Sequence, residues 1–393
     1  MTPAARVQAA IELLDQIIDA AKAKGAPADR LIASYFKQRR YAGSKDRRAV
    51  RELVYAAVRA CGPIPESGRA AMLRLAEQDD TITALFDGST HGAAAIGADE
   101  KPAPCGVAPD WLTQALTASG IDQNEAAALL DRAPLDIRVN TLKADRAGIE
   151  LPEMGEPLAA PQAVRFPTGT SVEQWPAYRD GQIEVQDHGS QLVCEAFAAK
   201  PGETVIDLCA GAGGKSLALA AAMQNQGRLL ACDTNRGRLS RLAPRAERAG
   251  AGLIQTLLLN PDRELEMLAE WRGVADAVLV DAPCSGTGTW RRNPEARWRL
   301  DETELAKLSA LQDRLIDIAA KLVKPGGRIG FVTCSLLDAE GKDRIAAALD
   351  RHSHLKSIDM ALPLGRARGA GIRLSPLHDG TDGFFVAMLR AGW

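Results

Sequence analysis

A regular alternation of short apolar runs and helical segments fills the second half of this 393-residue chain. Helical segments separate most of the runs, and strands that alternate with helices fold into a mainly parallel sheet covered on both faces. The sequence therefore predicts an α/β fold with a seven-stranded, mostly parallel sheet. The predicted strands are Thr204–Leu208, Arg228–Cys232, Gly252–Leu258, Ala275–Val280, Arg328–Thr333, Leu355–Ile358 and Phe384–Leu389.

Three motifs with chemically useful residues stand at the ends of these predicted strands. A glycine-rich loop, Asp207-Leu-Cys-Ala-Gly-Ala-Gly-Gly-Lys215, follows the first strand. A cysteine follows each of two later strands, in Asp281-Ala-Pro-Cys284-Ser-Gly-Thr-Gly and in Thr333-Cys334-Ser335. Ligands bind outside the carboxyl ends of parallel strands, so we expect the loop and the two thiols to share one site.

The glycine-rich loop has the composition of a nucleotide-binding loop, because glycines let the backbone approach a ligand without a side-chain clash. Asp233, at the end of the next predicted strand, can accept hydrogen bonds from both hydroxyls of a ribose. Ser216 stands where the dinucleotide fingerprint needs its third glycine, and Cys209 stands where a phosphate-binding P-loop needs its first. Lys215 offers a cation to a carboxylate such as that of a methionine moiety.

These features favour S-adenosylmethionine over a nicotinamide cofactor, and Lys324-Pro-Gly-Gly is a turn typical of methyltransferases that use it. The loop residues expected at this cofactor are Cys209, Ala210, Gly211, Ala212, Gly213, Gly214 and Lys215.

The motif around Cys284 indicates chemistry at a carbon atom. Enzymes that methylate exocyclic amines usually carry Asp/Asn-Pro-Pro-aromatic after the fourth strand, whereas this chain has Asp281-Ala-Pro-Cys284. Carbon 5 of cytosine becomes nucleophilic when a thiolate adds to carbon 6, and loss of the carbon-5 proton and the thiol then restores the ring. The attacking thiolate needs an electropositive or hydrogen-bonding setting, which Arg291 and Arg292 could supply.

The remaining cysteines have a simpler interpretation, because free cysteines often fill small apolar spaces in a core. We expect this role for Cys61, Cys105, Cys194, Cys209 and Cys232. The seven cysteines contain no CxxC pair, and the five histidines have neither metal nor triad spacing, so no metal site and no disulfide framework is predicted.

The first hundred residues read as helices and include a basic stretch over residues 30–51. Its cations could follow a phosphate backbone, or they could form an ordinary solvated helix face. The net charge of −2 does not decide between these two interpretations, because charge can be local. The candidate RNA-binding residues in this part are Arg39, Arg40, Lys45, Arg47 and Arg48.

Bulk properties agree with a globular protein of two or three domains, since 46% of residues are hydrophobic and 25% are charged. No run of about 18 apolar residues exists, so no membrane helix is expected. The first residues lack a signal-peptide core, and unpaired cysteines suit a reducing compartment. We therefore expect a cytoplasmic monomer.

At these residues the chain resembles the RsmB/Nop/Sun family of RNA cytosine-C5 methyltransferases, and the likeness covers most of the chain. It rests on the glycine-rich loop, both cysteine motifs, Arg138-Val-Asn-Thr, Gln186-Asp-x-x-Ser190 and Arg291-Arg-Asn-Pro-Glu295. The helical part, especially Ser44 to Arg59, is similar to the NusB-type RNA-binding domain of the bacterial ribosomal members.

The resemblance implies a Rossmann-like class I methyltransferase domain and assigns roles within it. Cys334 would be the nucleophile and Cys284 would assist release of the methylated base. Asp281 would contact the cytosine ring near N3. Asp233 and Lys215 would bind the cofactor, with Asp281 adjoining it, while Arg138, Arg291 and Arg292 would contact RNA.

The chain also departs from the family pattern. The usual loop is Cys-Ala-Ala-Pro-Gly-Gly-Lys, whereas Gly211 and Ala212 stand here in place of Ala-Pro. The acidic residue normally found after the third strand is missing, and Asn260 could bind the adenine instead. Gly341 stands where the family often has an asparagine after Thr-Cys-Ser.

Taken together, these features predict an RNA 5-methylcytosine methyltransferase, acting on 16S ribosomal RNA or alternatively on transfer RNA. An amine or small-molecule methyltransferase, and an RNA-binding ribosome-assembly factor with a decayed catalytic domain, are competing interpretations of the same motifs. The predicted domains are a NusB-like helical domain (1–105), a small α+β connecting subdomain (106–190) and the methyltransferase domain (191–393).

Overall fold

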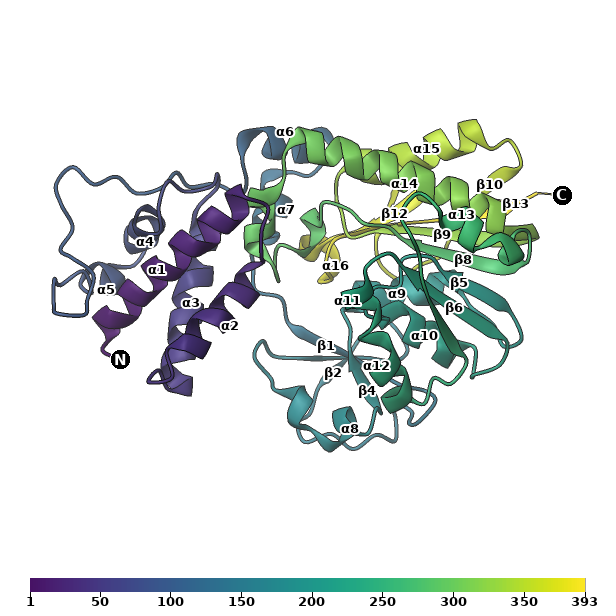
Figure 1. The fold of residues 1–393 in the computed structure, drawn as a ribbon, viewed down its shortest axis with the longest axis horizontal. Helices are drawn as coiled ribbons and strands as arrows, with labels where there is room; N and C mark the ends of the chain where they lie inside the picture. Colours follow the sequence, from purple (N-terminus) through teal and green to yellow (C-terminus); the bar gives the residue numbers. More distant parts are fainter. Residues whose placement is uncertain (393) are drawn as a thin grey trace. The chain divides into compact units, whose positions relative to one another are not determined.

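A mixed nine-stranded sheet forms the centre of the larger of two units into which the chain divides (Figure 1). The structure is a computed structural model and describes residues 1–392. The larger unit comprises residues 132–288 and the chain from residue 302 onward. The helical unit comprises residues 1–131 together with residues 289–301.

Parallel strands make up one side of the large sheet, in the order β9, β8, β5, β6, β7. They are β5 (Thr204–Asp207), β6 (Arg228–Asp233), β7 (Ile254–Leu258), β8 (Ala275–Asp281) and β9 (Val323–Thr333). β13 (Phe384–Ala391) runs antiparallel beside β9 and pairs in turn with β10 (Leu355–Ile358) and β12 (Gly371–Leu374). All seven predicted strands are therefore present.

Two strands that the sequence did not predict complete the sheet. β11 (Arg366–Arg368) and β12 form an antiparallel hairpin at the sheet edge. Five strands, β9 to β13, thus have an antiparallel partner, so the sheet is mixed rather than mostly parallel.

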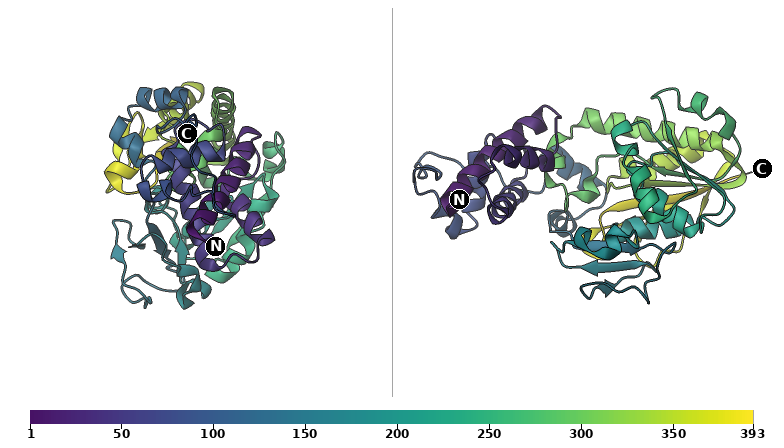
Figure 2. Two further views of the ribbon diagram at one scale, coloured as in Figure 1. Left: turned by 90° about the vertical axis from the view of Figure 1, so that its left-hand side faces the viewer. Right: turned by 60° about the horizontal axis from the view of Figure 1, so that its bottom comes forward.

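The central parallel strands β5, β6 and β8 are buried on both faces, which explains their apolar sequences, whereas the edge strand β7 exposes Gln255 and Thr256. Val205 and Leu229 point to one core and their neighbours Ile206 and Leu230 to the other. The first core includes α9 (His188–Phe197), α10 (Gly214–Ala222) and α12 (Leu242–Ala249), and the second includes α14 (Glu302–Leu322) and α15 (Lys342–Arg351). Figure 2 shows α14 running along the sheet.

A small antiparallel sheet precedes this arrangement in the chain, in the order β2, β3, β1, β4. Its strands are β1 (Leu135–Val139), β2 (Glu156–Pro157), β3 (Ala163–Phe166) and β4 (Ile183–Val185). The short helices of the larger unit are η1 (Val172–Gln174), α8 (Pro176–Arg179), α11 (Arg236–Leu239), α13 (Glu264–Met267), η2 (Ala269–Trp271), η5 (Asp338–Glu340) and α16 (Pro376–Asp379). The turn η3 (Thr287–Thr289) ends where the chain leaves this unit.

The helical unit packs around α1 (Pro3–Lys22), which contacts α3 (Ser44–Ala60) and α4 (Gly68–Ala76). Its further helices are α2 (Ala28–Gln38), α5 (Asp80–Thr83), α6 (Asp110–Ala118), α7 (Gln123–Ala128) and η4 (Pro294–Arg299). Trp298 lies in the same apolar core as α1 and α3. The segment 289–301 is therefore built into the helical unit although the chain on either side of it belongs to the larger unit.

These units differ from the three ranges predicted from the sequence. The helices α6 and α7 belong by their contacts to the helical unit, which the sequence prediction ended at residue 105. The small antiparallel sheet and the large sheet share one unit. The insertion of residues 289–301 was not predicted, because local sequence patterns do not report which core a loop enters.

The helices found over residues 1–392 contain none that is both long enough and apolar enough to span a bilayer. Within the same residues, no group of three or more His, Cys, Asp or Glu side chains is arranged to hold a metal ion.

Candidate active site

The ends of three neighbouring strands, β5, β8 and β9, bring the glycine-rich loop and both cysteine motifs together. β8 lies between the other two, and its last residue Asp281 pairs in register with Val332, just before the end of β9. The Sγ atoms of Cys284 and Cys334 lie 3.3 Å apart although 50 residues separate them in the chain. The expectation that the three motifs meet at one sheet edge is confirmed.

The two thiols share a hydrogen bond that affects the ionisation of Cys284. The hydrogen bond with Cys334 and burial together raise the pKa of Cys284 well above its ordinary value. The nearby carboxylate of Glu340 acts in the same direction. These effects favour the neutral thiol form of Cys284.

Glu340 is a buried carboxylate that ties the two cysteine loops together. Its Oε1 accepts hydrogen bonds from the Ser285 backbone N–H at 2.8 Å and from Gln312 Nε2 at 3.1 Å. Its Oε2 accepts a short hydrogen bond from the Ser285 hydroxyl. Gln312 also donates to the carbonyl of Pro283, directly before Cys284, at 2.9 Å. The position of Cys284 thus depends on a residue from the turn that follows Cys334.

A second tie joins the same loops through hydroxyl groups. Ser335 Oγ lies 3.1 Å from Thr287 Oγ1 and 3.2 Å from Ser285 Oγ. Thr287 in turn accepts a hydrogen bond from the backbone N–H of Leu336 at 2.9 Å. Sequence reasoning missed Glu340 and Gln312, since no local motif marks them, and it assigned no role to Thr287 although that residue lies within the Cys284 motif.

Lys215 joins the glycine-rich loop to the Cys284 motif. Its Nζ lies 2.7 Å from Asp281 Oδ2. Burial lowers the pKa of Lys215, but attraction to the Asp281 carboxylate outweighs burial, and the pKa lies above its usual value. Lys215 is therefore positively charged and holds Asp281 at the end of β8.

The glycine-rich loop needs glycine at two of its positions. Gly211 and Gly213 have φ angles of 58° and 86°, which side-chain-bearing residues rarely adopt. A Cβ atom on Gly213 would lie 1.7 Å from Leu242 Cδ1, and α10 begins directly after this turn. Although Gly211 and Ala212 replace the Ala-Pro of the usual family loop, the loop still makes a tight turn directly before the N-terminus of α10.

Asp233 fixes the loop from the neighbouring strand β6. Its Oδ2 accepts from the Gly211 N–H at 2.8 Å, and its Oδ1 accepts from the Asn235 N–H at 2.6 Å. Each carboxylate oxygen keeps further acceptor capacity, because a carboxylate has about four acceptor sites. Asp233 can therefore hold the loop and still receive a hydroxyl donor.

A cavity of about 450 Å³ opens between these groups. Its lining includes both thiols and the carboxylates Asp233, Asp281 and Glu264. The predicted residue Asn260 is exposed and is not part of the lining, whereas Glu264, four residues later, is buried at 5% exposure and lines it. Glu264 was missed because the sequence prediction looked for an acid directly after the third strand.

The predicted RNA-binding residues lie in different settings. In the helical unit, Arg40, Lys45, Arg47 and Arg48 are exposed, while Arg39 packs over the Tyr35 ring and bonds Glu12 at 3.1 Å. Arg138 is buried in the larger unit and donates to Gln186 Oε1 at 2.7 Å.

Arg291 is buried too, in the helical unit, and its carbonyl accepts from Arg59; Arg292 beside it is half-buried. The prediction that Arg138 and Arg291 contact RNA phosphates directly is therefore wrong, because a buried guanidinium does not reach the backbone of an RNA outside the protein. Both arginines have structural positions instead.

Two of the cysteines expected in the core are not buried. Cys61, Cys194 and Cys232 are buried as predicted, but Cys105 is exposed, and Cys209 is partly exposed and lines the cavity. Burial raises the pKa of Cys194 to about 12, so this thiol remains neutral.

The described residues fit an adenosine-type methyl donor at this cavity. The Asp233 carboxylate faces the cavity from the end of β6, in the position from which ribose hydroxyls are bound in such sheets. The backbone turn at Gly211 and Gly213 packs tightly against Arg238 and Leu242, so the loop backbone lies close to the end of β6 without side chains of its own. Both thiols, Cys284 and Cys334, lie in the lining of the same cavity.

Comparison with known proteins gives a consistent set of relatives. The model of the 16S rRNA methyltransferase RsmB/F family matches residues 194–390. Ribosomal RNA small subunit methyltransferase B of Xanthomonas campestris is 35% identical over 291 residues, covering 72% of this chain and 66% of that protein. The enzyme of the same name from Xylella fastidiosa is 33% identical over 293 residues, covering 72% and 68%. The match thus spans about two thirds of the curated relatives' length.

Solved structures show the same fold. The crystal structure of PH0851 superposes with a TM-score of 0.76 at 27% identity and covers 99% of both chains. NSun6 from Pyrococcus horikoshii, solved with SFG, has a TM-score of 0.62 at 18% identity and covers 72% of this chain and 98% of its own.

Proposed function

Because this chain belongs to the RsmB/F family of 16S rRNA methyltransferases, we propose that it methylates carbon 5 of a cytosine in small-subunit ribosomal RNA. The observation that carries the proposal is the 3.3 Å separation of the Cys284 and Cys334 sulfurs beside the cavity. S-adenosylmethionine is the cofactor and supplies an electrophilic methyl group when bound. The residues that fit it are Asp233 and the loop from Cys209 to Lys215.

Cys334 is the proposed nucleophile. Its thiolate forms a bond to carbon 6 of the cytosine, and the electron pair of the 5,6 double bond becomes available at carbon 5. Covalent addition of this kind turns one difficult step into two easier ones. The target base must leave its stack to reach the cavity, which suits a loop or single-stranded RNA segment.

Cys284 is the proposed base that releases the product. While Cys334 is ionised, its hydrogen bond to Cys284 keeps the Cys284 proton in place, in keeping with the raised pKa. Once Cys334 is bonded to carbon 6 it no longer carries a negative charge, so the main opposition to ionisation of Cys284 is removed. Cys284 then loses its proton to solvent and, as a thiolate, takes the proton from the methylated carbon 5. The electron pair of that C–H bond reforms the 5,6 double bond, and the bond from carbon 6 to Cys334 breaks, leaving Cys334 as a thiolate.

Asp281 and Lys215 are proposed to orient the ring. Asp281 lines the cavity between the strand end and Cys284, and Lys215 fixes one of its oxygens at 2.7 Å. The other oxygen can accept a hydrogen bond from the exocyclic amino group of a cytosine, which adjoins N3. The ion pair between Lys215 and Asp281 fixes the orientation of the Asp281 carboxylate before the base binds, which reduces the entropy lost on binding.

The helical unit is proposed to be a NusB-like domain that binds the RNA backbone. Arg40, Lys45, Arg47 and Arg48 are exposed on or beside α2 and α3. Exposed cations release counterions when they meet phosphates, so they add affinity without reading sequence.

Product analysis tests the proposed reaction. The protein is incubated with S-adenosylmethionine carrying a labelled methyl group and with small-subunit ribosomal RNA or transfer RNA, and the digested nucleosides are identified by mass spectrometry. Label in 5-methylcytosine from ribosomal RNA is expected. Label in transfer RNA alone would transfer the proposal to that substrate. Absence of both methyl transfer and cofactor binding would indicate a decayed domain that only binds RNA.

The division of labour between the thiols gives a second test. Cys334→Ala is expected to abolish turnover and to leave no covalent RNA complex. Cys284→Ala is expected to let the complex accumulate as a retarded band on a denaturing gel, because the release step lacks its base. Cys105→Ala, at an exposed cysteine outside the cavity, is the matched control and keeps full activity. A trapped complex with Cys334→Ala would reverse the two assignments.

A further inference from the structure

Glu264 is a buried carboxylate on the side of the cavity that follows β7. It is the first residue of α13, and it lines the cavity together with Asp233 and Asp281. The family pattern has an acid directly after this strand, but Asn260 stands there in this chain and is not part of the lining. Glu264 therefore brings a carboxylate to this side of the cavity from a different position in the chain.

The order of strands along the sheet edge places Asp233 between the thiols and Glu264. The strands follow one another as β9, β8, β5, β6 and β7. The two cysteines come after β9 and β8, Asp233 ends β6, and Glu264 belongs to the segment after β7. In S-adenosylmethionine the ribose likewise lies between the sulfonium group and the adenine. With the ribose at Asp233 and the methyl group toward the thiols, the adenine extends toward Glu264.

Apolar side chains in the same lining suit a flat aromatic base. Leu259, Leu311 and Leu315 line the cavity, and the last two are one turn apart on α14. An aromatic ring gains free energy when its faces leave water for such side chains. Its 6-amino group then needs an acceptor, because a buried donor without a partner costs free energy.

Arg314 fixes one oxygen of Glu264. It lies on α14 and donates from Nη2 to Glu264 Oε1 and from Nη1 to Asp262. Within the described residues 1–392, no other side chain bonds the Glu264 carboxylate, so its Oε2 remains available to a donor in the cavity.

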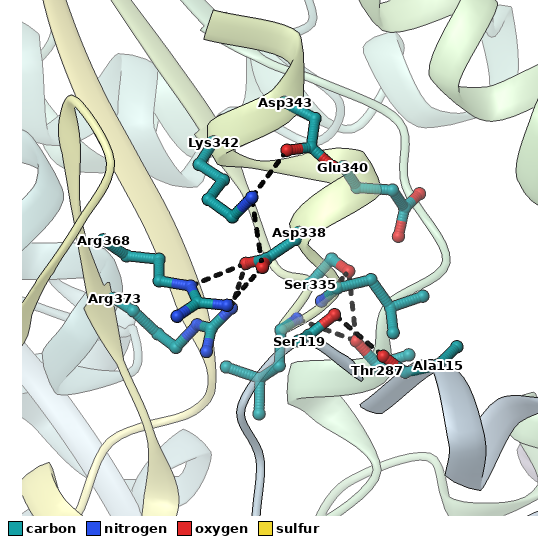
Figure 3. A network of polar contacts seen from close by, with 12 residues as sticks. Ala115, Ser119, Thr287, Ser335, Asp338, Glu340, Lys342, Asp343, Arg368 and Arg373 are labelled. Carbon is teal, nitrogen blue, oxygen red and sulfur yellow. Dashed lines mark hydrogen bonds and ion pairs between the residues drawn. The ribbon is translucent and has the colours of Figure 1, made fainter. Parts of the chain in front are cut away.

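Asp338, a carboxylate of the same unit outside the cavity lining, is bonded differently. Arg368 Nε and Arg373 Nη2 donate to its Oδ1 at 2.8 and 2.7 Å, and Lys342 Nζ lies 3.4 Å from its Oδ2 (Figure 3). Both oxygens of Asp338 are thus paired with cations of the protein itself. Glu264 pairs through one oxygen and keeps the other at the cavity, as a ligand-binding carboxylate would.

We propose that Glu264 recognises the adenine of the methyl donor by accepting a hydrogen bond from its 6-amino group, and that Arg314 is the positioning residue that holds Glu264 for this contact. The inference rests on the proposed methyltransferase function and names the residue that selects the base of its cofactor. A carboxylate accepts from an amino group but repels the oxygen of a 6-oxo purine, so this pair selects adenine over hypoxanthine.

Binding of two matched ligands tests this selection. S-adenosylhomocysteine carries adenine, and S-inosylhomocysteine carries hypoxanthine, which has a 6-oxo group in place of the 6-amino group. Calorimetry on the full chain is expected to show about tenfold to hundredfold tighter binding of the adenine ligand, the range for one hydrogen bond to a charged group. Glu264→Gln is expected to lower this ratio about tenfold, because its amide can also donate to the 6-oxo oxygen.

Glu266→Gln is the matched control. Glu266 is on the same helix, is exposed and pairs with Arg263 at 2.6 Å, but it does not line the cavity. This variant is expected to keep the wild-type ratio. A wild-type ratio in Glu264→Gln, or an equal loss of both ligands with a lower melting temperature, would overturn the inference, as would a wild-type protein without preference for adenine.

Substitutions of Arg314 test its positioning role. Arg314→Gln is expected to weaken S-adenosylhomocysteine binding several-fold and to lower the ratio, because the Glu264 carboxylate is no longer held. Arg314→Lys keeps the cation and is expected to recover part of both. A lower melting temperature with a wild-type ratio in Arg314→Gln would show that Arg314 only stabilises the fold.

Failure of the proposed function gives a different pattern. A wild-type protein that prefers the adenine ligand through Glu264 but transfers no methyl group to RNA would contradict the RNA methyltransferase proposal and support the role of Glu264. A protein that forms 5-methylcytosine without any preference between the two ligands would contradict only the role of Glu264.

Discussion

Asp207 shows how a single residue can serve the site at a cost to stability. It ends β5, is fully buried and accepts a hydrogen bond from the Ser216 hydroxyl at 2.6 Å. Burial raises the pKa of Asp207 from 3.8 to about 7, and the hydrogen bond from Ser216 only partly offsets that effect. The carboxyl group anchors the first turn of α10 under the glycine-rich loop, which explains its position in the motif.

The raised pKa makes Asp207 a source of pH-dependent stability. The folded state retains a proton that the unfolded state loses near pH 4, so this contribution is full at low pH and is lost as the pH rises through 7. Asp207→Asn cannot ionise. Its free energy of unfolding, relative to wild type, is expected to rise between pH 5 and pH 8 by on the order of 3 kcal/mol.

Thermal or denaturant unfolding at both pH values measures this difference. Asp350→Asn, at an exposed position of α15, is the control and should show no such change relative to wild type. Parallel curves for wild type and Asp207→Asn would show that the carboxyl is already ionised in the folded protein.

At the scale of elements, the sequence predicted what apolar runs and strand ends determine. All seven predicted strands are present, and the three motifs lie together because parallel strands end at one edge of the sheet. The hairpin of β11 and β12 was missed because Arg366-Ala-Arg368 is short, charged and largely exposed, so it has no apolar run to detect. The likeness to a family, not periodicity, separated the roles of Cys284 and Cys334.

The ties between loops could not be predicted for a different reason. Glu340 and Ser285 are 55 residues apart, and their contact exists only after β8 and β9 have paired. The burial of Arg138 could not be predicted either, since nothing in the local sequence distinguishes a buried arginine from an exposed one. Positions of this kind depend on tertiary packing and carry no local signal.

The turn η5 is expected to position the thiols through Glu340. Glu340→Ala leaves the Ser285 N–H without its acceptor and leaves Gln312 with only its bond to the Pro283 carbonyl, which costs about 1–3 kcal/mol of stability for each buried donor left unpaired. Methyl transfer is expected to fall at least tenfold with little change in RNA affinity, since the loop carrying Cys284 loses its anchor. Single-turnover methylation and filter binding measure the two quantities.

A conservative change distinguishes positioning from simple stability. Glu340→Gln keeps one acceptor oxygen for Ser285 or Gln312 and is expected to recover part of the activity. Glu247→Ala, at an exposed position of α12, is the control for loss of a carboxylate. An unimpaired Glu340→Ala enzyme would show that the hydroxyl ties through Ser335 and Thr287 position the loops without it.

On the scale of the whole molecule, the two units are interleaved in the chain. The chain leaves the larger unit after Gly288, adds residues 289–301 to the helical unit and returns at Glu302. Trp298 donates its indole N–H to the Gly62 carbonyl at 3.2 Å, and Arg297 donates to the carbonyls of Val58 and Cys61 at 2.6 and 2.5 Å. The returning segment is therefore an integral part of the helical core.

Trp298→Ala in the full chain tests this integration. Removal of a buried tryptophan leaves a cavity and is expected to destabilise the helical unit by about 3–5 kcal/mol. Differential scanning calorimetry should show an earlier transition for that unit, while S-adenosylmethionine binding by the larger unit is retained. Trp111→Ala, at a partly exposed position of α6, is the control. A wild-type melting profile for Trp298→Ala would contradict the role of the segment in the core.

The interleaving has a consequence for how such a protein can be divided or inherited. A gene shortened by deletion of residues 1–131 would still encode Arg297 and Trp298, whose side chains bond to and pack against the missing helices. The product would present a tryptophan to solvent shortly after the Cys284 motif and would tend to aggregate. A relative that lacks the helical part should therefore also differ over the stretch equivalent to 289–301, so gain or loss of the N-terminal helices requires two coordinated changes in one reading frame.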